Sequence, residues 1–96
     1  MKIIYTILLT GTLLSATEFT NRENGEFAGL GFAIAQKIDM NDKTIKKSNK
    51  YTMTKNCRNN LKEYIIFKSY KDKYEEALDF TIMQCVENLE KMNSSQ

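Results

Sequence analysis

The chain has 96 residues, 27% of them charged, with a formal net charge of +2, two cysteines and no histidine or proline. This length allows one small domain with a limited hydrophobic core. The lack of histidine removes the commonest general base and, because two thiols alone do not make a zinc site, it argues against a metal site as well.

The first predicted element is an export signal. A short basic start precedes an uncharged, mostly apolar run from Ile3 to Ala16. Spanning a bilayer takes roughly 20 apolar residues, so this run suits the centre of a secretory signal better than a transmembrane helix. We expect cleavage after Ala16, residues 17–96 as a single helical domain, and no stable membrane insertion afterwards; an uncleaved anchor is the alternative. Thr17 stands where a lipoprotein would need cysteine.

The rest of the chain is predicted to be all-α, because apolar residues recur at three- and four-residue spacing while strand-like alternation is weak. Residues 17–24 are expected to be irregular, and a first helix is expected over residues 25–38. Gly29 and Gly31 lie within this helix, where they would weaken it locally but let another backbone approach closely.

Two further long helices are predicted, over residues 52–69 and 74–92. Ahead of them, Asn41 or Asp42 is expected to cap a short helix that contains Ile45. The last helix has the most regular apolar stripe of the chain, formed by Tyr74, Leu78, Ile82, Cys85, Leu89 and Met92. The sequence therefore predicts a small helical bundle.

The two cysteines are predicted to join the last two helices. Cys57 and Cys85 lie on apolar helix faces, each 14 residues from Lys71 in the polar link 70–73. At 1.5 Å of rise per residue, both lie about 20 Å from that link. Helices packed about 8–10 Å apart can bring their Cβ atoms to disulfide distance. We expect a disulfide-linked antiparallel αα-hairpin in an oxidising compartment; two unrelated buried thiols are the alternative.

Charge is unevenly distributed along the chain. Residues 43–73 carry ten basic and two acidic side chains, an excess of +8, whereas residues 17–42 and 74–96 carry five acidic side chains each. Such a basic segment could meet an acidic partner, anionic lipid or nucleic acid. Pairing with the protein's own acidic ends is the alternative, and both interpretations stay open.

Signals for catalysis are scarce. Glu75, Glu76 and Asp79 form an acidic group, but they fall in the first turns of the last predicted helix, where carboxylates interact favourably with the helix dipole. Aromatic residues near the basic segment are interpreted as core or rim rather than as base-stacking platforms: Tyr51, Tyr64, Phe67, Tyr70 and Tyr74. We therefore expect no enzyme, no cofactor and no nucleic-acid binding.

The segment Leu61–Met92 resembles the C-terminal part of the Tai4 family, the immunity proteins against type VI secretion amidase effectors. That family tends to carry an aromatic-rich helix ending near a tyrosine, a short link, and a helix with a Met-Lys-Cys-Ile-Asp motif. Here the matching run is Met83-Gln84-Cys85-Val86-Glu87, and FAGLGFAIAQKIDMND stands where the family has its first helix. The sequence departs from the family where Gly31 and Ala33 occupy a region that often holds a cysteine, and where Lys91 replaces a common serine.

This resemblance implies a periplasmic protein, often a homodimer, that binds and blocks a peptidoglycan-cleaving cysteine amidase without catalysing a reaction. On this interpretation we expect Lys55, Arg58 and Lys62 to form part of the partner-binding surface; a solvated helix face is the alternative. Three other functions stay open: a phage-encoded periplasmic lysis regulator or exclusion factor, a periplasmic stress chaperone, and a eukaryotic secreted effector glycosylated at Asn93.

Overall fold

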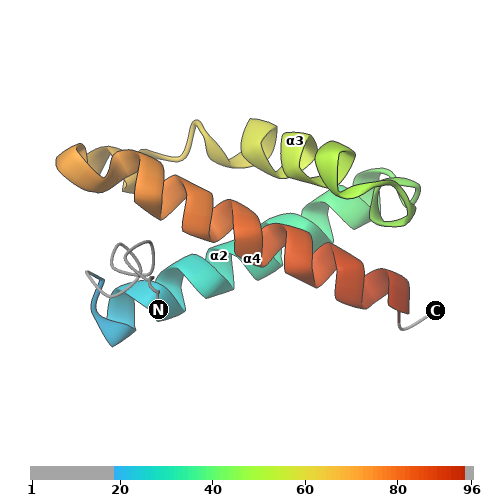
Figure 1. The fold of residues 1–96 in the computed structure, drawn as a ribbon, viewed down its shortest axis with the longest axis horizontal. Helices are drawn as coiled ribbons and strands as arrows, with labels where there is room; N and C mark the ends of the chain where they lie inside the picture. The colour runs from blue at the N-terminus through green and yellow to red at the C-terminus, as the bar shows by residue number, and fades with distance from the viewer. Residues whose placement is uncertain (1–18, 95–96) are drawn as a thin grey trace, which may run out of the picture.

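The computed structural model describes residues 19–94, with only the backbone described at Ile65, Ile66 and Lys71 (Figure 1). This part of the chain is all-α, as predicted. The predicted signal peptide and the predicted cleavage site after Ala16 fall outside the described residues. Its elements, in chain order, are α2 (Asn21–Asn41), the 3-10 helix η3 (Ile45–Lys47), α3 (Lys50–Leu61), the 3-10 helices η4 (Ile65–Ser69) and η5 (Lys71–Lys73), and α4 (Tyr74–Ser94).

Helix α2 begins at Asn21, four residues earlier than predicted, because its start is capped. The Thr20 hydroxyl oxygen accepts a hydrogen bond from the Glu23 amide at 3.1 Å, and the Glu23 carboxylate accepts one from the Thr20 amide at 2.9 Å. This reciprocal capping box satisfies two amides that a helix start leaves without partners. Residues 21–24 are therefore helical and not irregular, and the Thr-x-x-Glu spacing was the signal for it.

Helices α2 and α4 cross each other (Figure 1), and they approach closely at Gly31. A Cβ atom at Gly31 would lie 2.7 Å from the Gln84 Cβ and 2.9 Å from the Thr81 carbonyl oxygen. The expectation of a close backbone approach is confirmed here. It is wrong for Gly29, where an added Cβ would meet nothing within 4 Å.

The predicted helix over 52–69 is wrong at its C-terminal end, because α3 ends at Leu61. Tyr64 has extended backbone angles (φ −71°, ψ 130°), and η4 follows it as a separate element. The turn places the Phe67 ring, fully buried, against the Phe27 ring at a centroid distance of 6.2 Å. The Tyr74 hydroxyl then donates a hydrogen bond to the Lys62 carbonyl at the end of α3, at 3.2 Å.

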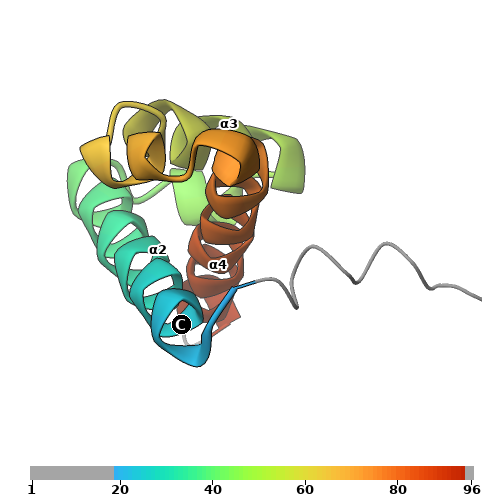
Figure 2. The same cartoon turned by 90° about the vertical axis from the view of Figure 1, so that its left-hand side faces the viewer.

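Helix α4 confirms its prediction to within two residues and provides the centre of the fold. In the end-on view, α3 and the 3-10 segments lie across the pair formed by α2 and α4 (Figure 2). The buried side chains of α4 are Ala77, Leu78, Thr81, Ile82, Cys85, Val86 and Leu89.

Aromatic side chains fill one end of the core. Of the predicted group, Phe67 is buried while Tyr70 and Tyr74 are partly buried against the core; Tyr51 and Tyr64 are exposed. Phe19, Phe27 and Phe80 complete the cluster, with ring centroids 5.1–6.4 Å apart. Burial raises the pKa of the Tyr70 hydroxyl, and nearby Glu23 and Glu26 carboxylates add to the increase.

The connection from α2 to α3 is held by acidic side chains of α2 and its C-cap. The Asp42 carboxylate accepts hydrogen bonds from the Thr44 hydroxyl at 2.6 Å and from the Thr44 amide at 2.9 Å. Asp42 was predicted to cap the short helix, but its hydrogen bonds to Thr44 form a turn before η3. The N-cap of η3 is Thr44, whose side chain makes no capping hydrogen bond. Lys46 is buried, with its Nζ atom 3.3 Å from an Asp39 carboxylate oxygen.

Candidate functional site

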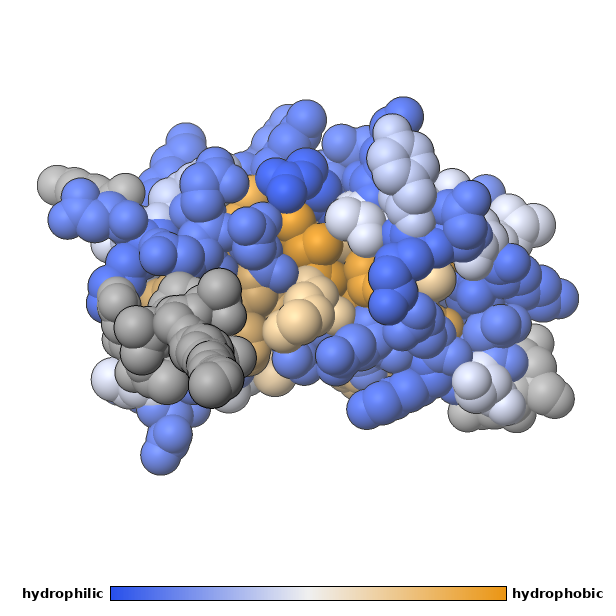
Figure 3. Space-filling view, viewed as in Figure 1, coloured by the Kyte–Doolittle hydropathy of each residue, from blue (hydrophilic) through white to orange (hydrophobic). Residues whose placement is uncertain are grey.

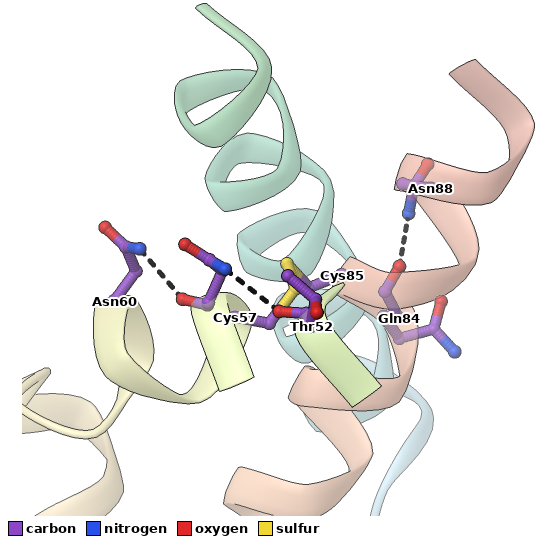
Figure 4. The surroundings of a disulfide bond; sticks show 7 residues. Thr52, Cys57, Asn60, Gln84, Cys85 and Asn88 are labelled. Atoms are coloured by element: carbon purple, nitrogen blue, oxygen red, sulfur yellow. Dashed lines mark hydrogen bonds between the residues drawn. A yellow bond between two sulfur atoms is a disulfide. The ribbon is translucent and has the colours of Figure 1, made fainter. Parts of the chain in front are cut away.

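The predicted disulfide between Cys57 and Cys85 is confirmed. It joins α3 to α4, with the two Cα atoms 6.1 Å apart and both side chains fully buried (Figure 4). The link between the two helices is longer than predicted, residues 62–73 rather than 70–73, because α3 stops early. Cys57 nevertheless lies opposite Cys85.

A groove runs between α3 and α4 and is the candidate functional site. We call it the α3–α4 groove; its volume is about 420 Å³. Figure 3 shows apolar surface between these two helices, bordered by hydrophilic side chains. Its floor is apolar, and Met83 there leaves 47% of its surface exposed, which is large for a hydrophobic side chain. The groove is lined by Lys50, Thr54 and Arg58 from α3 and by Asp79, Ile82, Met83, Val86, Glu87 and Glu90 from α4.

Two ion pairs bridge the groove. Arg58 Nη2 lies 3.2 Å from Asp79 Oδ1 towards one end, and Lys50 Nζ lies 3.6 Å from Glu90 Oε2 towards the other. This pairing shows that α3 and α4 run antiparallel. At 1.5 Å of rise per residue, the two pairs are separated by about 12 Å along α3 and about 16 Å along α4. Exposed ion pairs of this kind contribute only about 0–1 kcal/mol to stability.

The two walls of the groove carry charges of opposite sign. Helix α3 contains basic side chains and no acidic one, and Lys50 and Arg58 stand on its groove side. The charged side chains that α4 contributes are acidic: Asp79, Glu87 and Glu90. The groove therefore combines an apolar floor with one basic wall and one acidic wall.

The predicted partner-binding residues fall along the α3 side of the groove. Arg58 lines the groove and is paired with Asp79. Lys55 and Lys62 are exposed and lie outside the lining. At 100° per residue they project about 60° and 40° from Arg58, so the three form a row along the outer edge of α3.

Part of the basic segment pairs with the protein's own acidic ends. Besides Lys50 and Arg58, both Lys43 and Lys46 form ion pairs with Asp39. The alternative of internal pairing is confirmed at these four positions. For Lys55 and Lys62, no ion pair within 4.0 Å is formed with another residue of 19–94.

The acidic group predicted at the start of the last helix lies in the first two turns of α4. Glu75 and Glu76 lie in its first turn, as predicted, and Asp79 is held by Arg58. Across residues 19–94, no group of three or more histidine, cysteine, aspartate or glutamate side chains is placed to hold a metal ion. Over the same range, no helix is long and apolar enough to cross a membrane.

Of the nine residues that line the groove, only Arg58 is predicted from the sequence as a binding residue. Lys50 precedes the helix predicted from residue 52, Met83 falls outside the regular apolar stripe of α4, and Glu90 enters the prediction only through the net charge of residues 74–96. The signal that could have found Met83 is a methionine outside the buried stripe of an amphipathic helix, since methionine is enriched at protein interfaces.

No protein-family model, curated protein or solved structure matches this chain. The resemblance of Leu61–Met92 to the Tai4 immunity proteins therefore stays a prediction.

Proposed function

We propose that this protein is an exported, non-catalytic binding protein that holds a protein partner in the α3–α4 groove. The observation that carries this proposal is an apolar floor with an exposed methionine, Met83, between two helices that a buried disulfide joins. A rigid surface loses little ordering entropy when a partner binds, and exposed methionine is enriched at protein interfaces. The buried disulfide supports export, because such bonds persist in oxidising compartments such as the periplasm.

The partner that we propose is a peptidoglycan-cleaving amidase effector, which the protein would block as an immunity protein does. This part rests on the resemblance of Leu61–Met92, and that segment contains the floor and the acidic wall of the groove. An inhibitor needs surface complementarity and no reactive group of its own, which suits a chain without histidine.

The test first looks for a gene beside this one that encodes an amidase with a catalytic cysteine–histidine pair, and then uses that enzyme. Purified protein is expected to stop peptidoglycan hydrolysis at a stoichiometric ratio. Met83→Glu places a charge on the apolar floor and is expected to weaken binding by at least tenfold, measured by calorimetry. Met40→Glu is the matched control, since Met40 is 79% exposed on α2 and does not line the groove. Its affinity is expected to stay within about twofold of the wild type.

Charge reversal at Lys55, Arg58 and Lys62 together tests the predicted partner-binding row. A loss of affinity is expected because rim charges steer and orient a partner. Unchanged affinity would remove this row from the contact surface. Failure of the unmodified protein to bind or inhibit the neighbouring amidase would contradict the amidase as partner.

A further inference from the structure

We infer that the segment seated in the α3–α4 groove is an amphipathic helix of the partner, with an apolar row between one acidic edge and one basic edge. This inference rests on the proposed function and adds the chemistry of what the groove recognises. It follows from three features of the groove: its apolar floor, the opposite signs of its walls, and the ion pairs that bridge it.

The bridging ion pairs make exchange with a partner possible at small cost. An acidic side chain of the partner can replace Asp79 at Arg58 or Glu90 at Lys50, while a basic side chain of the partner takes the released carboxylate. Because an exposed pair contributes about 0–1 kcal/mol, the exchange is close to neutral. Affinity then comes from covering Met83 and its neighbours, and the charges set which partner fits.

The length of the groove suits a short helix. The ion pairs stand about 12–16 Å apart, which is the length of about 8–11 helical residues. A helix bound in a groove contacts it through apolar side chains spaced three and four residues apart. We expect the partner helix to place such side chains on the apolar floor.

Partners of a single charge sign fit this groove less well. Nucleic acid or an anionic lipid surface would be attracted by Lys50 and Arg58 but repelled by Asp79, Glu87 and Glu90. A partner helix with a basic edge on one side and an acidic edge on the other satisfies both walls, and it can do so in one of the two directions along the groove.

The experiment uses three synthetic helical peptides about three turns long with the same apolar row. One has a glutamate edge and a lysine edge, one has two glutamate edges, and one has two lysine edges. Affinity is measured by fluorescence anisotropy, and the site is located from chemical-shift changes at the Met83 methyl group. The mixed peptide is expected to bind about tenfold more tightly than either other peptide, and to shift the Met83 signal.

Reversing one wall should change this preference. Lys50→Glu with Arg58→Glu makes both walls acidic, and the peptide with two lysine edges is then expected to bind best. Lys37→Glu with Lys68→Glu is the matched control, since both lysines are exposed and neither lines the groove. The control should keep the preference for the mixed peptide. Circular dichroism and thermal unfolding verify that each variant is folded.

Three results would overturn the inference: equal affinity for all peptides, binding that leaves Met83 unshifted, or binding of none. A dimer of this chain that Met83→Glu dissociates would also overturn it, by showing that a second copy covers the groove. These results are distinguishable from failure of the proposed function. If the protein selects the mixed peptide but does not bind the amidase, the inference about the groove holds and the proposed function fails. If the protein inhibits the amidase, Met83→Glu abolishes this inhibition, and the three peptides bind equally, the proposed function holds and the inference fails.

Discussion

Gly31 lies where α2 and α4 cross, and the space between the two helices there has no room for a side chain larger than hydrogen. A methyl group there would contact the Gln84 Cβ at 2.7 Å and the Thr81 carbonyl oxygen at 2.9 Å. Neither atom can move without its helix, so Gly31→Ala is expected to lower the free energy of unfolding by about 1–3 kcal/mol. Urea denaturation measures the change.

Gly29 is the matched control for this substitution. It lies in the same helix, but an added Cβ would meet nothing within 4 Å. Gly29→Ala is therefore expected to raise the free energy of unfolding by about 0.5–1 kcal/mol, because alanine loses less backbone freedom on folding. Similar effects at both positions would contradict the close crossing at Gly31.

The Asp42 carboxylate offers a second test at the scale of single residues. Hydrogen bonds from the Thr44 hydroxyl and the Thr44 amide hold the pKa of Asp42 below its ordinary value. Since the pKa is lower in the folded state, these bonds stabilise the fold above the ordinary pKa, and this contribution is lost as the pH falls through the lowered value.

Thr44→Val removes the hydroxyl donor, which is the larger cause of the shift, and is expected to raise the Asp42 pKa towards its ordinary value. Carboxyl carbon chemical shifts measured over acidic pH give the titration directly. Thr54→Val is a suitable control, because Thr54 lies on α3 and makes no hydrogen bond to this carboxylate. An unchanged Asp42 titration in the Thr44 variant would show that the hydroxyl bond is absent in solution.

At the scale of elements, the start of α2 depends on its capping box. Thr20→Ala removes the hydroxyl that accepts from the Glu23 amide and is expected to lower the free energy of unfolding by about 1 kcal/mol. Glu23→Gln keeps a side-chain oxygen that can accept from the Thr20 amide, so most of the stability should remain. Thermal unfolding of both variants compares them. Equal losses would mean that the charge at Glu23, and not the reciprocal bonding, holds the helix start.

The elements differ in how well the sequence alone predicts them. Helix α4 is predicted to within two residues because its apolar side chains repeat regularly at helical spacing. The end of α3 is not predicted, because no glycine or proline marks it. The end of α3 depends on contacts with residues outside the helix. Phe67 packs on Phe27, and the Tyr74 hydroxyl donates a hydrogen bond to the carbonyl of Lys62, the C-cap of α3.

The same distinction applies to the candidate site. The disulfide could be predicted, since both cysteines lie on apolar stripes at matching distance from the turn. The groove could not be predicted, because the residues that line it depend on which side of α4 stays uncovered after α2 and α3 have packed against it. Arg58 could be predicted because it belongs to a row of basic residues. Met83 could not, because its exposure in the groove depends on how α3 packs against α4.

At the scale of the whole molecule, the disulfide links the stability of the fold to the shape of the groove. Cys57 and Cys85 close a loop with a sequence separation of 28 residues. On the chain-entropy argument, such a closure stabilises a protein by roughly 3–4 kcal/mol, and small domains have only about 5–15 kcal/mol in total. The bond therefore provides a large share of the stability that keeps α3 beside α4.

Cys57→Ala with Cys85→Ala is expected to lower the free energy of unfolding by roughly 3–4 kcal/mol in urea denaturation. The wild type refolded under reducing conditions is the control, because it keeps both sulfur atoms in the core and removes only the bond. Equal losses in the two samples would assign the stabilisation to the covalent link. A small loss in the reduced protein and a large one in the double variant would assign it to packing of the sulfur atoms. In that case the walls of the groove would stay aligned without the bond, and partner affinity should survive reduction.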